Sequence, residues 1–364
     1  MSKLLYNLQG IARMLLPRAF YQANLSHKIK QIFKDFDDMT LQHIANRVNY
    51  YHKINTPFAL PAPNLAQNIL ATNKSNQNPK PPLSLQTPNI DILLRNNPTS
   101  THSTVYYYDS YQWSRYFNDN FVWAYQFGDV NYYLDTPAIT KTRPLDLPKE
   151  NPKILKGGGE SNENSILLPL DKNRHFCFFA DKIPYKDKKD KLIFRGACYQ
   201  HHRNKFLQMY FNHPLCDIAD TSDKKHNADF IGRKISKQKH CEYKFILSLE
   251  GNDVASNLKW AMNSNSLCIM PKPTFESWFM EGRLIAGVHY AQIDDEYSNV
   301  ESTLDYYLSH EKEALDIIKN AQNFCKDFQN QRYEEACCLL VLRKYFALSG
   351  QLDISKEERE MFEI

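Results

Sequence analysis

Glycine is scarce in this sequence, with 11 residues among 364. Collagen-like repeats, flexible glycine linkers and nucleotide sites built on glycine-rich loops are therefore disfavoured. An excess of one charge is also lacking, because 45 Lys and Arg residues against 41 Asp and Glu residues leave a formal net charge of +4. A balance this close to neutral does not predict a nucleic-acid partner.

Paired cysteine motifs are missing too. The eight cysteines include no CxxC pair, and the adjacent Cys337 and Cys338 suit neither a zinc knuckle nor a redox motif. Most cysteines fall in apolar runs, which predicts a reduced, cytoplasmic chain that uses cysteine as a small hydrophobic residue. No stretch approaches 18 apolar residues, so we expect a soluble or peripheral protein.

Acidic residues are absent from the first 34 positions. Leucine or isoleucine at 4, 5, 8, 11 and 15 predicts a basic amphipathic helix that ends near Pro17. Two interpretations stay open, namely packing on its own domain and contact with an anionic membrane surface through residues 1–34. The basic residues of this stretch are Lys3, Arg13, Arg18, Lys28, Lys30 and Lys34.

The length and the 42% of apolar residues predict two domains. We expect an N-terminal domain over 1–185, which includes the basic helix and an irregular Pro/Asn-rich segment at 55–100. A C-terminal domain follows over 186–345, and 346–364 form a tail.

The second half alternates short apolar runs with helical patterns. Strands are predicted at 192–194, 245–249, 267–270 and 287–290, with helices through 205–210 and 257–263. This alternation is typical of an α/β fold with a parallel, helix-covered sheet. The end of the chain is predicted to be helical, beginning with a capping box formed by Ser298 and Glu301 and continuing in helices from 311 to 324 and from 334 to 348.

Two segments of this half carry residues suited to a phosphate. A buried strand leads into the turn 250–253 and then into a helix that starts near Ser256 and Asn257, with Lys259 close by. In an open parallel sheet such a turn lies where ligands bind, and a helix start offers free N–H groups. The other segment is FRG at 194–196 before Arg203, whose guanidinium can bridge two phosphate oxygens. Ordinary turn and helix-start roles remain the alternative for both.

Metal ligands are harder to find. His201 and His202 lack an HExxH pattern, and Cys198 with His201 is an unsupported nucleophile pair. A DxD triplet occurs only at 35–37, inside an apparent helix and not after a strand. We therefore expect chemistry that needs no metal.

The order of several motifs resembles glycosyltransferase family 90. They are FRG at 194–196 followed by Arg203, CEYK at 241–244, EGNDVASNLKW at 250–260 and GVHY at 287–290. Three further motifs, YYYDSYQW at 106–113, FGDV at 127–130 and RHF at 174–176, are most similar to the bacterial lipopolysaccharide core branch of the LpsA type.

The resemblance implies a GT-B-like arrangement of two Rossmann-like domains facing a central cleft, with a helical C-terminus. It also implies an inverting, metal-independent transfer from a UDP-sugar, without a cofactor. Arg203 corresponds to an arginine that contacts the diphosphate, and Gly196 lies in the turn before it. Asn257 occupies the position at which the eukaryotic branch has arginine. The positive charge expected beside the diphosphate would therefore come from Arg203 or Lys259. The residues on the donor-binding loop and helix start are Gly251, Asp253, Ser256, Asn257 and Lys259.

The family's general base is an aspartate that ends a strand in the N-terminal domain. Asp129 matches it best, with Asp109 as the alternative, and a plain turn role for Asp129 also stays open. An inverting transfer needs one carboxylate to take the proton of the acceptor hydroxyl. Glu276 is expected either to hold ribose or sugar hydroxyls or to act as a helix-start carboxylate.

These inferences predict an enzyme that moves glucose or galactose from UDP to a heptose of a lipopolysaccharide or lipooligosaccharide core, at the cytoplasmic face of the inner membrane. Aromatic residues between 106 and 125 are expected to line the acceptor cleft. Transfer to a protein or capsule polymer is the enzymatic alternative. A noncatalytic binder of carbohydrate or nucleic acid is the other, although the charge balance argues against nucleic acid.

Overall fold

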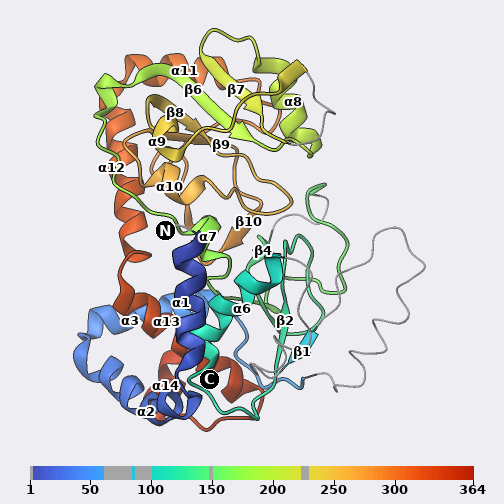
Figure 1. Cartoon of the computed structure of the whole chain (residues 1–364), viewed down its shortest axis with the longest axis vertical. Coiled ribbons are helices and arrows are strands. Elements are labelled where there is room, and N and C mark those ends of the chain that lie inside the picture. The colour runs from blue at the N-terminus through green and yellow to red at the C-terminus, as the bar shows by residue number, and fades with distance from the viewer. Residues whose placement is uncertain (1–2, 61–83, 87–100, 147–150, 223–228) are drawn as a thin grey trace. The chain divides into compact units, whose positions relative to one another are not determined.

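The computed structural model describes residues 3–60, 84–86, 101–146, 151–222 and 229–364 (Figure 1). The chain divides into two compact units. The first consists of Met1–Arg174, Glu276–Trp278 and Asn330–Ile364, and the second of His175–Phe275 and Phe279–Gln329. The fold is mixed α/β, with parallel sheets and a helical C-terminus. The domain limits expected from the sequence, 1–185, 186–345 and 346–364, stay predictions.

The first unit begins with three consecutive helices, α1 (Lys3–Leu15), α2 (Arg18–Asp35) and α3 (Asp38–Tyr51). Pro17 precedes α2, which confirms the predicted helix end, because proline lacks the N–H that would continue α1. Asp37 caps α3 by accepting the N–H of Thr40 at 2.8 Å. The DxD triplet at 35–37 thus begins at the last residue of α2 and ends at the cap of α3, so only Asp35 lies inside a helix as predicted.

A small sheet lies in the first unit with strand order β1-β2-β3-β5. Strand β1 pairs antiparallel with β2, whereas β2, β3 and β5 are parallel to one another. A two-stranded sheet joins β4 and β10. Apart from 55–60 and β1, the Pro/Asn-rich segment 55–100 lies outside the described residues. The strands are β1 (Ser84–Gln86), β2 (Trp123–Gln126), β3 (Ala138–Thr140), β4 (Thr142–Pro144), β5 (Ser165–Leu167) and β10 (Phe275–Ser277), and the remaining helices are α6 (Thr101–Ser114), α7 (Lys172–His175), α13 (Gln331–Leu348) and α14 (Lys356–Phe362).

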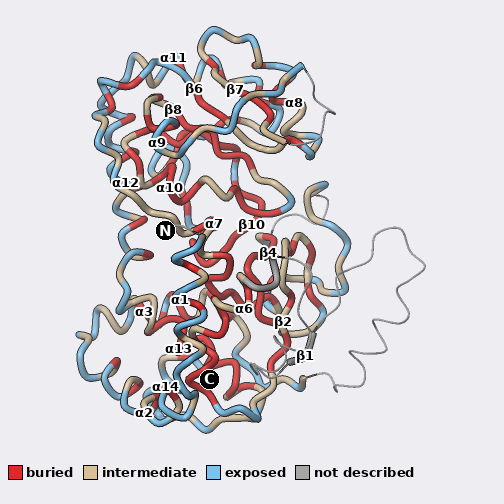
Figure 2. The backbone as a smooth tube through the Cα atoms, in the orientation of Figure 1, coloured by how far each residue is buried: buried red, intermediate tan, exposed pale blue. Residues whose placement is uncertain are grey.

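The second unit is built on a parallel sheet with strand order β11-β9-β8-β6-β7. Its central strands are buried, as Figure 2 shows, and Leu192, Phe245 and Ile269 belong to one apolar core. The predicted parallel, helix-covered sheet is confirmed here. Its elements are β6 (Lys189–Gly196), α8 (His201–Tyr210), β7 (Cys216–Asp220), α9 (Lys237–His240), β8 (Tyr243–Leu247), α10 (Leu258–Met262), β9 (Leu267–Met270), β11 (Ala291–Gln292), α11 (Val300–Ser309) and α12 (Glu311–Asp327), with 3-10 turns at Tyr185–Asp187 and Glu281–Arg283.

Two local predictions were wrong. Residues 287–290 form a turn and not a strand, because Gly287 has φ +73° and its N–H bonds back to the carbonyl of Tyr290 at 2.9 Å. The predicted capping box is also absent from α11, since Ser298 Oγ instead donates to Asp294 Oδ2 at 2.6 Å. A capping box does occur at the start of α14, between Ser355 and Glu358.

All eight cysteines are free, and seven of them are buried. This agrees with their predicted use as small hydrophobic residues. Among the helices of the described ranges, we find none with the length and apolarity that a bilayer crossing requires.

Candidate active site

The second unit has a strand-order reversal between β6 and β8. From β6 the chain passes through α8 to β7 on one side, and from β8 it passes through α10 to β9 on the other. In doubly wound sheets, ligands bind outside the carboxyl ends of the two strands where the order reverses. The candidate ligand site of this unit is therefore the pair of loops at 197–200 and 248–257. The two loops adjoin the two segments that the sequence predicted for a phosphate.

Arg203 ties these two loops together. Its Nε and Nη2 donate to the carbonyls of Glu250 and Leu249 at 2.8 and 2.7 Å, and its Nη1 donates to the carbonyl of Ala197 at 2.8 Å. The ring nitrogen Nε2 of His202 lies 2.8 Å from the same Glu250 oxygen. The predicted arginine thus fixes the relative position of both loops from the first turn of α8.

Two of the predicted glycines lie beside these loops. A Cβ on Gly251 would lie 3.4 Å from Nη2 of Arg203, and one on Gly196 would lie 2.7 Å from the ring of Phe194. A side chain at 196 would therefore push against Phe194, whereas one at 251 would make ordinary contact with Arg203.

Glu250 is a residue of this site that the sequence reasoning did not single out. Its Oε1 accepts the backbone N–H groups of Thr274 and Phe275 at 2.7 and 3.0 Å. It thereby joins the loop after β8 to the segment before β10. An acidic residue in the turn after a buried strand was the available signal.

The helix start after the loop differs from the expectation. Helix α10 has only five residues, and Asn257 donates through Nδ2 to the carbonyl of Leu247 at 2.8 Å, which holds the end of β8. Asp253 is buried, whereas Ser256 is half-buried. A helix this short has little dipole to offer a phosphate. The donor contacts predicted for these three residues stay predictions.

Lys259 is fully buried in the second unit. Its ammonium pairs with Glu281, which is 1% exposed, and lies 5.9 and 5.4 Å from the ring centroids of Phe176 and Phe279. A charge placed this way is compensated inside the unit and is not presented at the loops. Its predicted contact with a diphosphate stays a prediction, and that contact would require this ion pair to open.

Arg203→Lys is expected to weaken UDP binding about ten- to a hundredfold, because one ammonium group cannot bond three carbonyl oxygens on two loops. Titration calorimetry with UDP measures the effect. Arg233→Lys, at an exposed arginine of the same unit, is the matched control and should bind UDP like the parent. Unchanged affinity in Arg203→Lys would contradict the role of this arginine.

In the first unit, Asp129 lies at the carboxyl edge of the parallel strands. It follows β2 after Gly128, whose φ of +103° turns the chain, and its Oδ1 accepts from Nζ of Lys141 at 2.6 Å. Lys141 follows β3 and its side chain is 2% exposed, whereas that of Asp129 is 31% exposed. A buried ammonium therefore holds a carboxylate that solvent can reach. Lys141 was not predicted from the sequence, although it directly follows a buried strand.

Asp109, the alternative base, lies in α6 with 0% exposure. Its Oδ2 accepts the backbone N–H of Lys172 at 2.8 Å. Burial raises the pKa of this carboxyl group, and Lys172 opposes that rise only partly. A carboxyl group enclosed in this way cannot reach an acceptor hydroxyl, so the geometry favours Asp129.

Most of the predicted acceptor-binding aromatics belong to the core of the first unit. Tyr106, Tyr111, Trp113 and Trp123 are each at most 7% exposed. Buried rings cannot stack on a sugar, so the prediction was wrong for these residues. Tyr125 is half-buried and stacks on Phe127, with 4.1 Å between ring centroids, two residues before Asp129.

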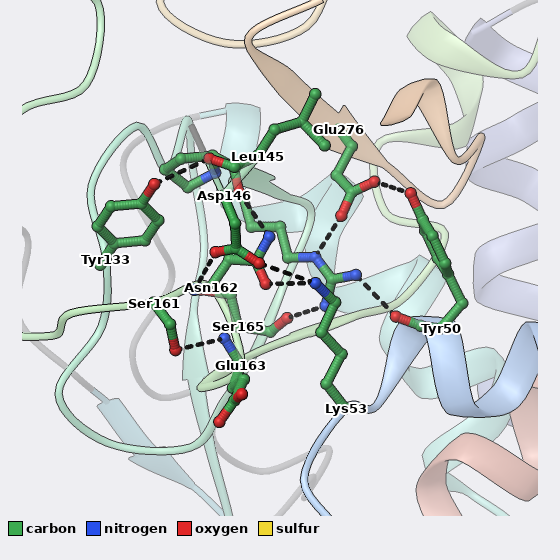
Figure 3. Close-up of polar contacts among 12 residues, drawn as sticks. Tyr50, Lys53, Tyr133, Leu145, Asp146, Ser161, Asn162, Glu163, Ser165 and Glu276 are labelled. Atoms are coloured by element: carbon green, nitrogen blue, oxygen red, sulfur yellow. Dashed lines mark hydrogen bonds and ion pairs between the residues drawn. The ribbon is translucent and has the colours of Figure 1, made fainter. Parts of the chain in front are cut away.

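Glu276 lies in the first unit, inside a polar cluster (Figure 3). Its carboxylate accepts from Nε of Arg143 at 2.7 Å and from the hydroxyl of Tyr50. The same guanidinium also donates to the carbonyls of Tyr50 and Ser165 at 2.7 and 3.1 Å. Arg143 and Glu276 are each at most 1% exposed, so this pair connects α3, β4, β5 and β10. The predicted role of Glu276 in holding ribose or sugar hydroxyls stays a prediction, and both its oxygens already have partners.

Glu276→Gln is expected to lower the free energy of unfolding by about 3 kcal/mol, because it leaves the Arg143 guanidinium buried without a counter-charge. Urea unfolding measures this loss. Glu163→Gln, at an exposed glutamate near the same cluster, should change stability little. Full stability together with weaker UDP-sugar binding in Glu276→Gln would instead favour a donor contact.

Metal ligands do not gather in the described parts of either unit. Across those ranges, no group of three or more His, Cys, Asp or Glu side chains is arranged to hold a metal ion. Cys198, considered above as a nucleophile, is buried, which raises its pKa to about 12. The expectation of chemistry without a metal stays a prediction.

Comparison with known proteins gives consistent matches. Residues 174–351 match the family described as Glycosyl transferase family 90. The chain is 38% identical over 309 residues to O-glucosyltransferase LpsA of Dichelobacter nodosus, which covers 84% of this chain and 83% of that protein. It is also 23% identical over 155 residues to Protein O-glucosyltransferase 1 of Homo sapiens, which covers 41% of this chain and 39% of that protein. Because the identity to the first of these relatives is 38% over most of both chains, the chain belongs to glycosyltransferase family 90, and it is a glycosyltransferase.

Proposed function

We propose that this enzyme transfers a hexose from a UDP-sugar to a heptose of a lipopolysaccharide or lipooligosaccharide core. The observation that carries the proposal is the 38% identity to O-glucosyltransferase LpsA across 84% of the chain. Of the two hexoses that the sequence left open, glucose is favoured over galactose, because these relatives are named glucosyltransferases.

We assign binding of the sugar donor to the second unit. The two units would then correspond to the two Rossmann-like domains of a GT-B enzyme. The uridine diphosphate would bind at the loops 197–200 and 248–257, which Arg203 holds together. The position of these loops at a strand-order reversal supports this assignment. Backbone N–H groups and Arg203 would stabilise the charge of the departing diphosphate without a metal.

Asp129 would act as the general base in the first unit. Its carboxylate takes the proton from the acceptor hydroxyl while that oxygen forms a bond to the anomeric carbon. The bond from that carbon to the β-phosphate oxygen breaks at the same time, so its electron pair leaves with UDP and the anomeric centre inverts. Lys141 holds the carboxylate in place at 2.6 Å.

The compartment proposed for this reaction is the cytoplasm, at the face of the inner membrane. The eight free cysteines support a reducing compartment. A lipid-linked core acceptor would bring the enzyme to the membrane surface.

A panel of UDP-sugars, assayed with and without a chelator, tests the proposal. We expect UDP release from UDP-glucose, stimulation by a heptose-terminated core oligosaccharide, and no effect of the chelator. Hydrolysis of only another sugar nucleotide would overturn the proposed donor. Loss of activity in the presence of the chelator would overturn the proposal that no metal is needed. Stimulation by an unglycosylated protein and not by core oligosaccharide would favour the alternative acceptor class.

A further inference from the structure

Residues 274–278 form a short buried segment that runs from one unit into the other. The chain leaves the second unit between Phe275 and Glu276, and it returns after Trp278. All five residues of this segment are at most 3% exposed. A segment buried in this way keeps its position through specific contacts, and the contacts at its two ends come from different units.

Glu250 holds the first end of the segment. Its Oε1 accepts the backbone N–H groups of Thr274 and Phe275 at 2.7 and 3.0 Å. Hydrogen bonds to a carboxylate are about twice as strong as those between neutral groups. The carbonyl of the same residue accepts from Nε of Arg203 at 2.8 Å. Glu250 is therefore fixed in the loop 248–257 through its backbone, and its side chain holds the segment.

Side chains of the first unit hold the other end. The carboxylate of Glu276 accepts from Nε of Arg143 at 2.7 Å and from the hydroxyl of Tyr50 (Figure 3). Trp278 stacks on Tyr51 with 3.7 Å between ring centroids, and the Tyr51 hydroxyl donates to the carbonyl of Trp278 at 2.9 Å. This end of the segment cannot shift without breaking a buried ion pair and a ring stack.

We propose that Glu250 is a positioning residue, which couples the order of the loop 248–257 to the contacts of Glu276 in the first unit. One peptide bond joins Phe275 to Glu276, so a shift of Glu276 also moves the backbone N–H of Phe275 that Glu250 holds. The loop is then ordered only as firmly as the first unit holds Glu276.

The coupling does not depend on which sugar is moved, so it goes beyond the proposed transfer reaction. Coupling between two sites is reciprocal. A ligand that orders the loop 248–257 must therefore also strengthen the contacts of Glu276. Weaker contacts of Glu276 must in turn weaken the binding of that ligand by the same factor. With UDP as the ligand, this expectation rests on the proposed function.

Hydrogen exchange of the full chain without any ligand tests the coupling. Tyr50→Phe removes one hydrogen bond to Glu276 and keeps the ring. We expect the amides of the loop 248–257 to exchange about three- to tenfold faster in this variant, the range for one net hydrogen bond. Glu250→Ala should speed the same amides. Adding Tyr50→Phe to Glu250→Ala should have no further effect on them, because the link is already missing.

Tyr133→Phe is the matched control for Tyr50→Phe. The Tyr133 hydroxyl donates to the carbonyl of Leu145 at 2.8 Å in the same unit, so its loss should leave exchange in the loop unchanged. Glu250→Gln keeps an oxygen that can accept the same N–H groups, and it should restore most of the protection that Glu250→Ala loses. Parental exchange of the loop in Tyr50→Phe would overturn the proposal. So would an equal acceleration by Tyr50→Phe with and without Glu250.

Calorimetry with UDP on the same four proteins separates this coupling from the proposed function. Tyr50→Phe should weaken UDP binding by the factor seen in exchange, and it should have no effect when Glu250→Ala is present. A loop that responds to Tyr50→Phe in a protein that does not bind UDP would support the coupling and contradict the proposed donor. UDP binding by the parent together with a loop that does not respond would overturn the coupling alone.

Discussion

Asp129→Asn is expected to lower the turnover number of sugar transfer by about a thousandfold, because an amide cannot take the proton of the acceptor hydroxyl. Asparagine keeps the size of the side chain, and its oxygen can still accept from Lys141. The proposed UDP loops belong to the other unit, so affinity for UDP should be unchanged. Steady-state transfer assays and UDP calorimetry on the same preparation measure both quantities.

The matched control for this experiment is Asp135→Asn, at an exposed aspartate of the same unit. It should transfer sugar at the parental rate. Full transfer activity in Asp129→Asn would remove Asp129 from the role of base. A parallel loss of UDP affinity would point to a wider disturbance of the protein.

The second large effect that we expect is a lower free energy of unfolding at alkaline pH. Burial raises the pKa of six thiols above an ordinary value near 9. It reaches about 12 for Cys198, Cys216, Cys241 and Cys268, and the pKa values of Cys325 and Cys338 are raised further. Above pH 9 the unfolded chain therefore releases protons that the folded chain keeps, so stability falls as pH rises from about 9 toward about 12. One pH unit above its ordinary value, each thiol costs about 1.4 kcal/mol.

One buried lysine acts in the opposite direction. Burial lowers the pKa of Lys344 to about 8, so its contribution to stability improves between about pH 8 and the ordinary lysine value. The gain by pH 10 is about 2 kcal/mol, against a loss of about 1.4 kcal/mol from each of the buried thiols. The thiols dominate, and we expect a net loss of stability between about pH 8 and about pH 10.

Urea unfolding at about pH 8 and about pH 10 measures this net change. Cys268→Ala should reduce the alkaline loss by about 1.4 kcal/mol, whatever its baseline stability. Cys177→Ala, at the partly exposed cysteine, should leave the loss unchanged. The same alkaline loss in Cys268→Ala and in the parent would contradict the assignment to buried thiols.

Local patterns were sufficient to predict much of the second unit. The apolar runs at 192–194, 245–249 and 267–270 overlap parallel strands, and Arg203 and Gly251 do lie together at the carboxyl edge of the sheet. These predictions succeeded because strand burial and helix periodicity depend on neighbouring residues. The strand wrongly expected at 287–290 failed because a left-handed glycine turned an apolar run back on itself.

Side-chain partners from distant segments could not be predicted in this way. Lys259 was expected beside a phosphate, but its partner Glu281 lies 22 residues further along the chain. Arg143 and Glu276 are 133 residues apart in the sequence and meet only once β4 and β10 have paired. The type of a residue limits which hydrogen bonds and ion pairs its side chain can form. The packing of strands and helices decides which of these form.

The sequence by itself therefore determined the family, the parallel sheet of the second unit and the residue types available for proton transfer and diphosphate binding. The tertiary structure decided which charges are buried in pairs, that Asp129 and not Asp109 is reachable, and that the predicted apolar side of α1 faces outward. The physical reason is that hydrophobic periodicity fixes which side of a helix is apolar. Contacts between distant residues, such as Gly10 with Tyr108, fix which side is buried.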